Sequence, residues 1–131
     1  MLELVIVLIL LAILASYIAS RLNNTDAYQQ DSVIEQLVSA AQLTQQLSMN
    51  DPTRVFSLDI QANQINLLAG GVPFSSAGIS FPIAIDADIT LSPASNITFN
   101  MAGTTAGATI NVTADTTIQV CIESSGYIHR C

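Results

Sequence analysis

The two cysteines near the C-terminus carry the clearest chemistry in this sequence. Cys121 and Cys131 are the only cysteines, and the residues between them include Glu123-Ser124-Ser125-Gly126, which predicts a turn. A metal site would need more ligands, and His129 is the only histidine. We therefore expect a disulfide between the two arms of a hairpin, formed in an oxidising compartment outside the cytoplasm, with two free thiols as the alternative.

Glu3 is the only charged residue in the first 19 residues, which are otherwise almost entirely apolar. A carboxylate within or at the edge of a bilayer costs ~2.5–3.5 kcal/mol, so it usually has a partner or a function. One interpretation places Glu3 at the level of the lipid headgroups, where the positive end of the helix dipole favours it. The other is that Glu3 pairs with a cation on another chain during assembly.

Other residues that could do chemistry are sparse. The chain has no lysine and no glycine-rich phosphate loop. Three aspartates offer oxygen ligands for calcium, namely Asp86, Asp88 and Asp115. An EF-hand-like run of such ligands is missing from the sequence. We expect no enzymatic activity, no cofactor and no metal site.

Composition excludes several classes of protein. The 131 residues are 50% hydrophobic, and 10 acidic residues against 3 arginines give a net charge of -7. Binding to nucleic acid needs clustered cations, as does docking on anionic lipid, so neither partner is expected. Disorder is excluded too, because disordered chains combine low hydrophobicity with high charge.

The apolar N-terminus predicts a helix that is retained in a membrane. Residues 4–15 form an unbroken apolar run, and residues 1–19 approach the ~20 residues that span a bilayer. A cleaved signal peptide would begin with basic residues, whereas here no Lys or Arg precedes Arg21.

A second, amphipathic stretch follows over residues 26–49. Its apolar residues recur at steps of three and four, which is the period of a helix with one buried face: Val33, Ile34, Leu37, Val38 and Ala41. Asn50-Asp51-Pro52 should end the helix, because the residue before a proline avoids the α region. An unbroken helix over residues 2–49 would be ~70 Å long, with residues 20–24 as its weakest stretch. One end of such a rod must project into lipid or other subunits.

After Pro52 the apolar period changes from 3.6 to 2, which predicts short antiparallel strands. The predicted strands cover residues 56–60, 65–67, 79–85, 89–91, 97–101, 110–112, 118–122 and 127–129. Residues 61–64 should form a hairpin turn and residues 70–73 a loop, and Pro82 should place its strand at a sheet edge. The sequence thus predicts an α+β fold: an apolar helix (residues 1–22), its amphipathic continuation (23–51) and a β-rich head (52–131).

The N-terminal residues MLELVIVLILLAILA resemble the first segment of mature type IV pilins and type II secretion pseudopilins, an apolar helix with one early glutamate. The later strands resemble those of H-type minor pseudopilins and FimT-like proteins. Residues 120–131 look most like pilins of mannose-sensitive haemagglutinin (MSHA) type systems. Two features depart from the family: its glutamate usually lies two residues further from the mature N-terminus, and its helix-breaking proline is absent from residues 20–24.

The resemblance implies a pilin-like fold and assembly into a filament. In the family, the early glutamate, here Glu3, lies near the N-terminal amine of a neighbouring subunit and sets the register. The apolar helices then pack in the filament core and the β heads form its wall. The core residues would include Leu4, Val5, Val7, Leu8 and Leu11.

The resemblance also implies partners and a location. A prepilin peptidase would process the precursor, whose new N-terminus the family methylates. The subunit would wait in the inner membrane at the pilus assembly platform, then join identical subunits in an extracellular filament.

Three functions are compatible with these observations. The first is a structural pilin of a type IV pilus-like filament for adhesion, motility or surface attachment. The second is a minor pilin or pseudopilin that primes assembly at the tip of a pilus or a type II secretion pseudopilus. The third is a membrane-anchored binding domain that never polymerises, although Glu3 would have no good role in a monomer.

Overall fold

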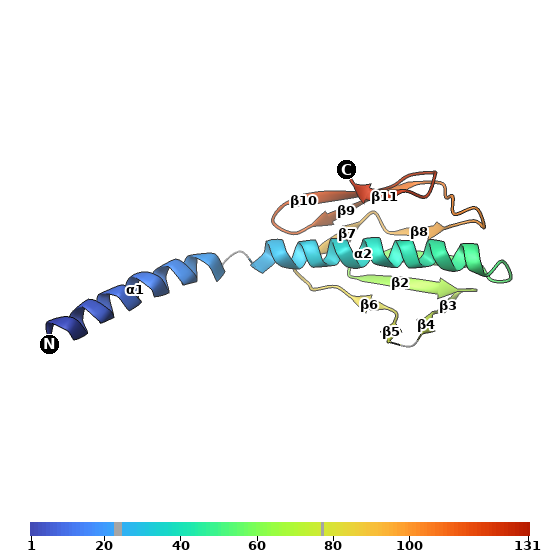
Figure 1. Ribbon diagram of the computed structural model, residues 1–131. Coiled ribbons are helices and arrows are strands. Elements are labelled where there is room, and N and C mark those ends of the chain that lie inside the picture. Colours follow the sequence, from blue (N-terminus) through green and yellow to red (C-terminus); the bar gives the residue numbers. More distant parts are fainter. Residues whose placement is uncertain (23–24, 77) are drawn as a thin grey trace.

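The computed structural model describes residues 1–22, 25–76 and 78–131. Helix α1, Leu2–Leu22, projects away from a head in which helix α2, Thr25–Asn50, lies along a layer of strands (Figure 1). The predicted α+β fold, with an N-terminal helix carrying antiparallel sheets, is confirmed. Of the predicted weak stretch, Ser20 to Leu22 are helical, whereas Asn23 and Asn24 lie outside the described residues.

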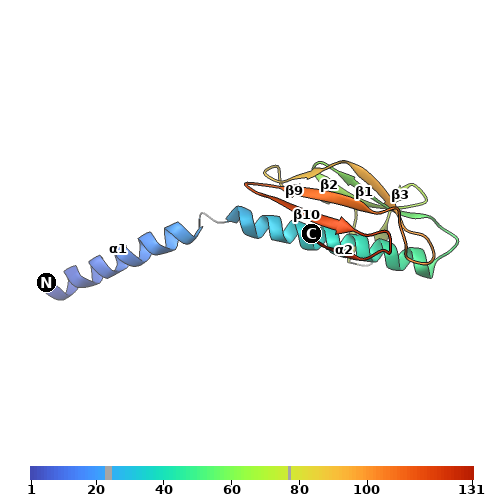
Figure 2. The same ribbon diagram turned by 90° about the horizontal axis from the view of Figure 1, so that it is seen from above.

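The head contains two larger antiparallel sheets and one small one. The strands are β1 Phe56–Gln61, β2 Gln64–Ala69, β3 Val72–Pro73, β4 Ser75–Ser76, β5 Ile79–Ser80, β6 Ile83–Ala84, β7 Thr90–Ser92, β8 Ser95–Thr98, β9 Ala108–Thr113, β10 Thr117–Ile122 and β11 Ile128–Arg130. The first sheet has the order β3-β2-β1-β8, with β6 also paired to β2, and the second has the order β11-β10-β9-β7. Strands β4 and β5 form a separate pair. Both larger sheets lie on the same side of α2 (Figure 2).

The core of the head lies between α2 and the two larger sheets. The helix buries a stripe of residues at the predicted spacing: Val33, Ile34, Leu37, Ala40 and Ala41. Strand β1 buries alternate residues, as its period of two predicts, so that Phe56, Leu58 and Ile60 face the helix layer. Removing this apolar surface from water is the main stabilising contribution to the head.

Helix α2 ends where the sequence predicts, at Asn50. The next residue, Asp51, accepts hydrogen bonds from the hydroxyl and the backbone N–H of Thr53, and its carboxylate is 2.8 Å from Nε of Arg54. These donors stabilise the charged carboxylate, the Thr53 hydroxyl most of all, and lower the pKa of Asp51 to about 2.

Two stretches were wrongly predicted. Residues 79–85 do not form one strand, because Pro82 has no N–H and separates β5 from β6, which pair with β4 and β2 respectively. The predicted loop over residues 70–73 is a tight turn at Gly70 and Gly71 that brings Val72–Pro73 back onto β2 as β3.

The predicted strand over residues 97–101 ends earlier than expected. Strand β8 stops at Thr98, and Met101 is exposed in the following turn. Asn100 organises this turn, because its side-chain carbonyl accepts the backbone N–H groups of Ala102 and Thr104. Local hydrogen bonds of an asparagine therefore override the alternation of apolar residues.

Two glutamines fasten α2 to the second sheet and its connections. Near the start of the helix, Nε2 of the buried Gln30 donates to the carbonyls of Val112 (2.8 Å) and Thr116 (2.9 Å). Towards its end, Nε2 of Gln45 donates to the carbonyls of Gly103 (2.8 Å) and Gly126 (3.2 Å). Each amide donates to two backbone carbonyls, so helix and sheet are held together at both ends.

Gly126 is required by this packing. A Cβ there would overlap the carbonyl oxygen of Gly103 and the amide of Gln45, and the φ of Gly126 is +90°. We expect Gly126→Ala to lower the free energy of unfolding by ~1–3 kcal/mol more than Gly71→Ala does. Gly71 is the matched control because its φ is +85° and a Cβ there meets nothing within 4 Å. Urea denaturation of the full chain in detergent measures both, and equal losses would contradict the packing argument.

Candidate assembly surface

Helix α1 is an apolar surface that its own chain leaves uncovered. The predicted assembly residues lie in its first half, where Leu4, Val5, Val7, Leu8 and Leu11 are each more than half exposed. Among the residues that the structure describes, one helical stretch, at the N-terminus, is long and apolar enough to cross a membrane. Such a surface requires lipid or other apolar helices around it.

Glu3 lies in the first turn of α1, where the helix dipole favours a negative charge. Its side chain is exposed, and it forms no hydrogen bond or ion pair with any described residue. The structure of the single chain therefore places Glu3 at the outer end of the apolar helix, available to a cation on another molecule.

The other end of α1 carries a cation. Nη2 of Arg21 donates to the hydroxyl of Tyr17 (3.1 Å), and its guanidinium lies 5.6 Å from the centre of that ring. The remaining arginines have carboxylate partners within the head: Arg54 with Asp51 (2.8 Å) and Arg130 with Asp31 (2.8 Å).

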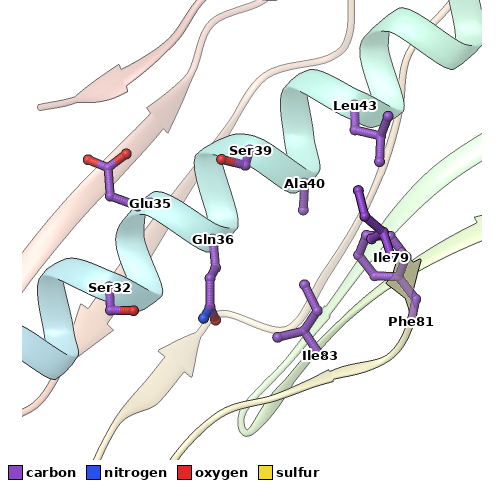
Figure 3. Close-up of a pocket in the computed structure, with 9 residues that line it drawn as sticks. All are labelled: Ser32, Glu35, Gln36, Ser39, Ala40, Leu43, Ile79, Phe81 and Ile83. Carbon is purple, nitrogen blue, oxygen red and sulfur yellow. The ribbon is translucent and has the colours of Figure 1, made fainter. Parts of the chain in front are cut away.

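A groove of about 370 Å³ lies between α2 and strands β5 and β6 (Figure 3). Figure 3 shows that the helix contributes four polar and two apolar residues to the lining, whereas the chain beside it contributes three apolar ones. The helix residues are Ser32, Glu35, Gln36, Ser39, Ala40 and Leu43, and the others are Ile79, Phe81 and Ile83. Glu35 is the only charged residue in this lining, and no histidine, cysteine or lysine lines it. The groove is suited to holding an apolar group.

Sequence reasoning did not find this groove. It arises because the chain from Ile79 to Ile83 lies against a helix that is more than thirty residues away in sequence. The alternation of residues 79–85 predicted apolar contacts, but Ile79 is 48% exposed. No local sequence pattern predicts a groove between two segments that are distant in sequence.

The C-terminal hairpin contains the disulfide that the sequence indicates. Cys121 on β10 is joined to Cys131, which follows β11, with a Cα–Cα distance of 5.7 Å. The backbone N–H of Cys131 donates to the carbonyl of Gln119 (3.1 Å). Arg130 connects this hairpin to α2 through Asp31, so the chain end is tied to the head twice.

His129 lies on the same hairpin between two hydrogen-bond acceptors. Its Nε2 is 3.0 Å from Oε1 of Glu123, its Nδ1 is 2.8 Å from the carbonyl oxygen of Arg130, and its ring stacks on Tyr127. Only the protonated imidazole can donate to both acceptors at once. The bond to Glu123 and, secondly, the bond to Arg130 therefore raise the pKa of His129 above its ordinary value of 6.5.

The structure brings together two of the aspartates considered above as calcium ligands. Asp88 and Asp115 line a hollow of about 340 Å³ with Asp26 and Gln29, at the end of the head next to α1, whereas Asp86 does not line it. Within the part of the chain that is described, no three acidic, histidine or cysteine residues are close enough together to hold a metal ion.

Comparison with known proteins supports an assignment of the fold. No protein-family model matches the sequence, and no curated protein matches it significantly. A crystal structure of the type IV minor pilin FimU from Pseudomonas aeruginosa matches with a TM-score of 0.59 and 18% identity, over 82% of this chain and 91% of FimU. A second crystal form of FimU gives a TM-score of 0.55 and 18% identity, over 77% and 91%. The chain has a type IV pilin-like fold.

In this pilin-like fold, the predicted residues fall into two separated groups. Glu3 and the apolar residues lie on the projecting helix, whereas the disulfide closes the hairpin at the C-terminus of the head. The MSHA-type or FimT-like subtype suggested by the last strands stays a prediction, because the similarity to FimU concerns the fold.

The hairpin should be more stable at low pH than at high pH. Because the folded protein raises the pKa of His129, the stabilisation is complete below about pH 6.5 and is lost as the pH rises through the raised pKa. NMR titration of His129 should show this pKa, and Glu123→Gln should move it back towards its ordinary value. Asp59→Asn removes the same charge from β1 in the other large sheet and should leave the titration unchanged. An unshifted pKa in the unmodified chain would contradict the geometry.

Proposed function

We propose that this chain is a non-enzymatic subunit of a type IV pilus-like filament and polymerises through α1. The observation that carries the proposal is the complete exposure of this apolar helix. Before assembly, lipid covers it; in a filament, the helices of neighbouring subunits do. The contacts join different surfaces of successive copies, and heterologous contacts of this kind produce an open helical filament when they do not close into a ring.

Glu3 sets the register of this assembly. A carboxylate taken into an apolar core is strongly disfavoured unless an opposite charge accompanies it. The N-terminal amine of a neighbouring subunit supplies that charge, so only one axial position of the incoming helix satisfies both groups.

In this proposal, the subunit is first processed in the membrane and then assembled outside the cell. A prepilin peptidase cleaves the precursor, the new N-terminus is methylated, and the subunit stays in the inner membrane at the pilus assembly platform. It then leaves the membrane and joins identical subunits outside the cell, where the filament serves adhesion, motility or surface attachment. The Cys121–Cys131 disulfide supports an oxidising location for the head.

A second candidate function is that of a minor pilin which primes assembly at the filament tip. The observation that favours it is the similarity of the fold to FimU, which is a minor pilin. Abundance separates the two candidates: a major subunit dominates the sheared filament fraction, whereas a minor pilin contributes a few copies to each filament.

The substitution Glu3→Ala should stop filament assembly without preventing membrane insertion. The apolar helix is unchanged, but the group that pairs with the incoming subunit is lost. Quantitative mass spectrometry of the sheared extracellular fraction and of the membrane fraction measures both steps. Glu35→Ala, the same substitution on the exposed face of α2, serves as the control and should assemble normally.

Normal amounts of Glu3→Ala chain in filaments would overturn the charge-pairing argument. An unmodified chain that is never found outside the membrane would overturn the filament itself. That result would favour a membrane-anchored binding domain with the groove beside Phe81 as its site.

A further inference from the structure

Arg21 is the one arginine that has no carboxylate partner among the described residues. Arg54 and Arg130 each lie 2.8 Å from an aspartate of their own head, whereas Arg21 contacts only the ring and hydroxyl of Tyr17. Packing α1 among other subunits would take this guanidinium partly out of water. A guanidinium in that position needs an acceptor, because an unpaired charge in an interface is strongly disfavoured.

The hollow at the α1 end of the head is the complementary feature. Asp26 comes from the first turn of α2, Asp88 from the chain between β6 and β7, and Asp115 from the turn between β9 and β10. None of the three forms an ion pair or a side-chain hydrogen bond with a described residue, and no cation lines the cavity of about 340 Å³. Three aspartates from three segments thus line one hollow, and Gln29 adds an amide.

Within one chain, Arg21 does not fill this hollow. It lies on α1 beside Tyr17, and its guanidinium forms no ion pair with Asp26, Asp88 or Asp115. Arg21 lies in the last turn of α1 and Asp26 in the first turn of α2, so the arginine and the hollow are close to one another along the chain. A second copy displaced along the direction of α1 would bring its own Arg21 to the hollow.

We propose that Arg21 of one copy inserts into the hollow formed by Asp26, Asp88 and Asp115 of an adjacent copy. This inference rests on the proposed filament. Arginine suits the site because its planar guanidinium donates several hydrogen bonds to carboxylates from different directions. The pairing fixes the lateral neighbour and its axial displacement, while Glu3 acts at the opposite end of α1.

Stoichiometry supports a second copy of the same chain as the partner. Each chain carries one such arginine and one such hollow on different surfaces, so every copy can give and receive one contact. A contact of this type continues from copy to copy without closing on itself, as a filament requires.

Charge exchange between the two sites tests the proposal. Arg21→Glu and Asp115→Arg should each lower the chain in the sheared filament fraction by about tenfold or more, because like charges then meet in the interface. The double variant carrying both changes should restore assembly. Asp115 is suited to the exchange because it is exposed on a turn, and its substitution leaves the membrane helix untouched.

Asp86→Arg is the matched control, because Asp86 is exposed close to the same end of the head but does not line the hollow. It makes the same change of charge and should assemble like the unmodified chain. Membrane fractionation of each variant shows that the subunit is still inserted.

Five outcomes are possible. Loss of assembly in both single variants with recovery in the double variant supports the pairing. Single variants that assemble normally overturn it and leave the proposed filament intact, as does failure of both single variants without recovery. Loss of wild-type filaments on adding a calcium chelator, with no effect of Arg21→Glu, assigns the hollow to an inorganic cation and also overturns the pairing. Absence of wild-type filaments overturns the proposed function itself.

Discussion

The uncovered apolar surface of α1 is the constraint on which the rest of the molecule depends. A helix of 21 residues whose apolar side chains are exposed on all sides cannot remain in water, and the head offers it no cover. Lipid and neighbouring helices are the two environments that satisfy it, and in the filament that we propose the helix passes from the first to the second. The charges at its two ends, Glu3 and Arg21, then become the groups that distinguish one packing of these helices from another, because apolar contacts alone tolerate sliding.

Helix α2 has the opposite character, because strands of its own chain cover one face of it. One face of α2 is buried in the core, and Gln30 and Gln45 bind backbone carbonyls of the second sheet and its connections at positions 15 residues apart. The ends of the head are therefore fixed relative to the helix axis. That rigidity holds the turn bearing Asp115 next to the first turn of α2, so the hollow there has a defined shape. The interface that we propose there is built from three separate segments, and this support would let it recur identically in every copy.

The sequence predicted what depends on local period and composition: the apolar helix, the buried stripe of α2, the β1–β2 hairpin and the end of α2 before Pro52. It did not predict features that depend on which distant segments meet. Gln30 and Val112 are 82 residues apart, and Asp31 and Arg130 are 99 apart. The prediction of a single strand over residues 79–85 was wrong for a related reason. The alternation of apolar residues is present, but Pro82 separates β5, which pairs with β4, from β6, which pairs with β2. No sequence pattern links Asp26, Asp88 and Asp115, because only the fold brings these residues together.

The distribution of charge gives a physical reason for a specific contact, in addition to apolar burial, in the proposed filament. Glu3 and Arg21 cancel, so the remaining nine acidic residues and two arginines leave the whole net charge of -7 on the head and its helix α2. Neighbouring heads in the proposed filament would therefore repel one another, and salt screens this diffuse repulsion over ~8 Å at physiological ionic strength. A guanidinium held between carboxylates in a partly desolvated hollow is screened much less. Added salt thus weakens the opposing force more than the pairing, and a filament built this way gains stability as ionic strength rises from low values.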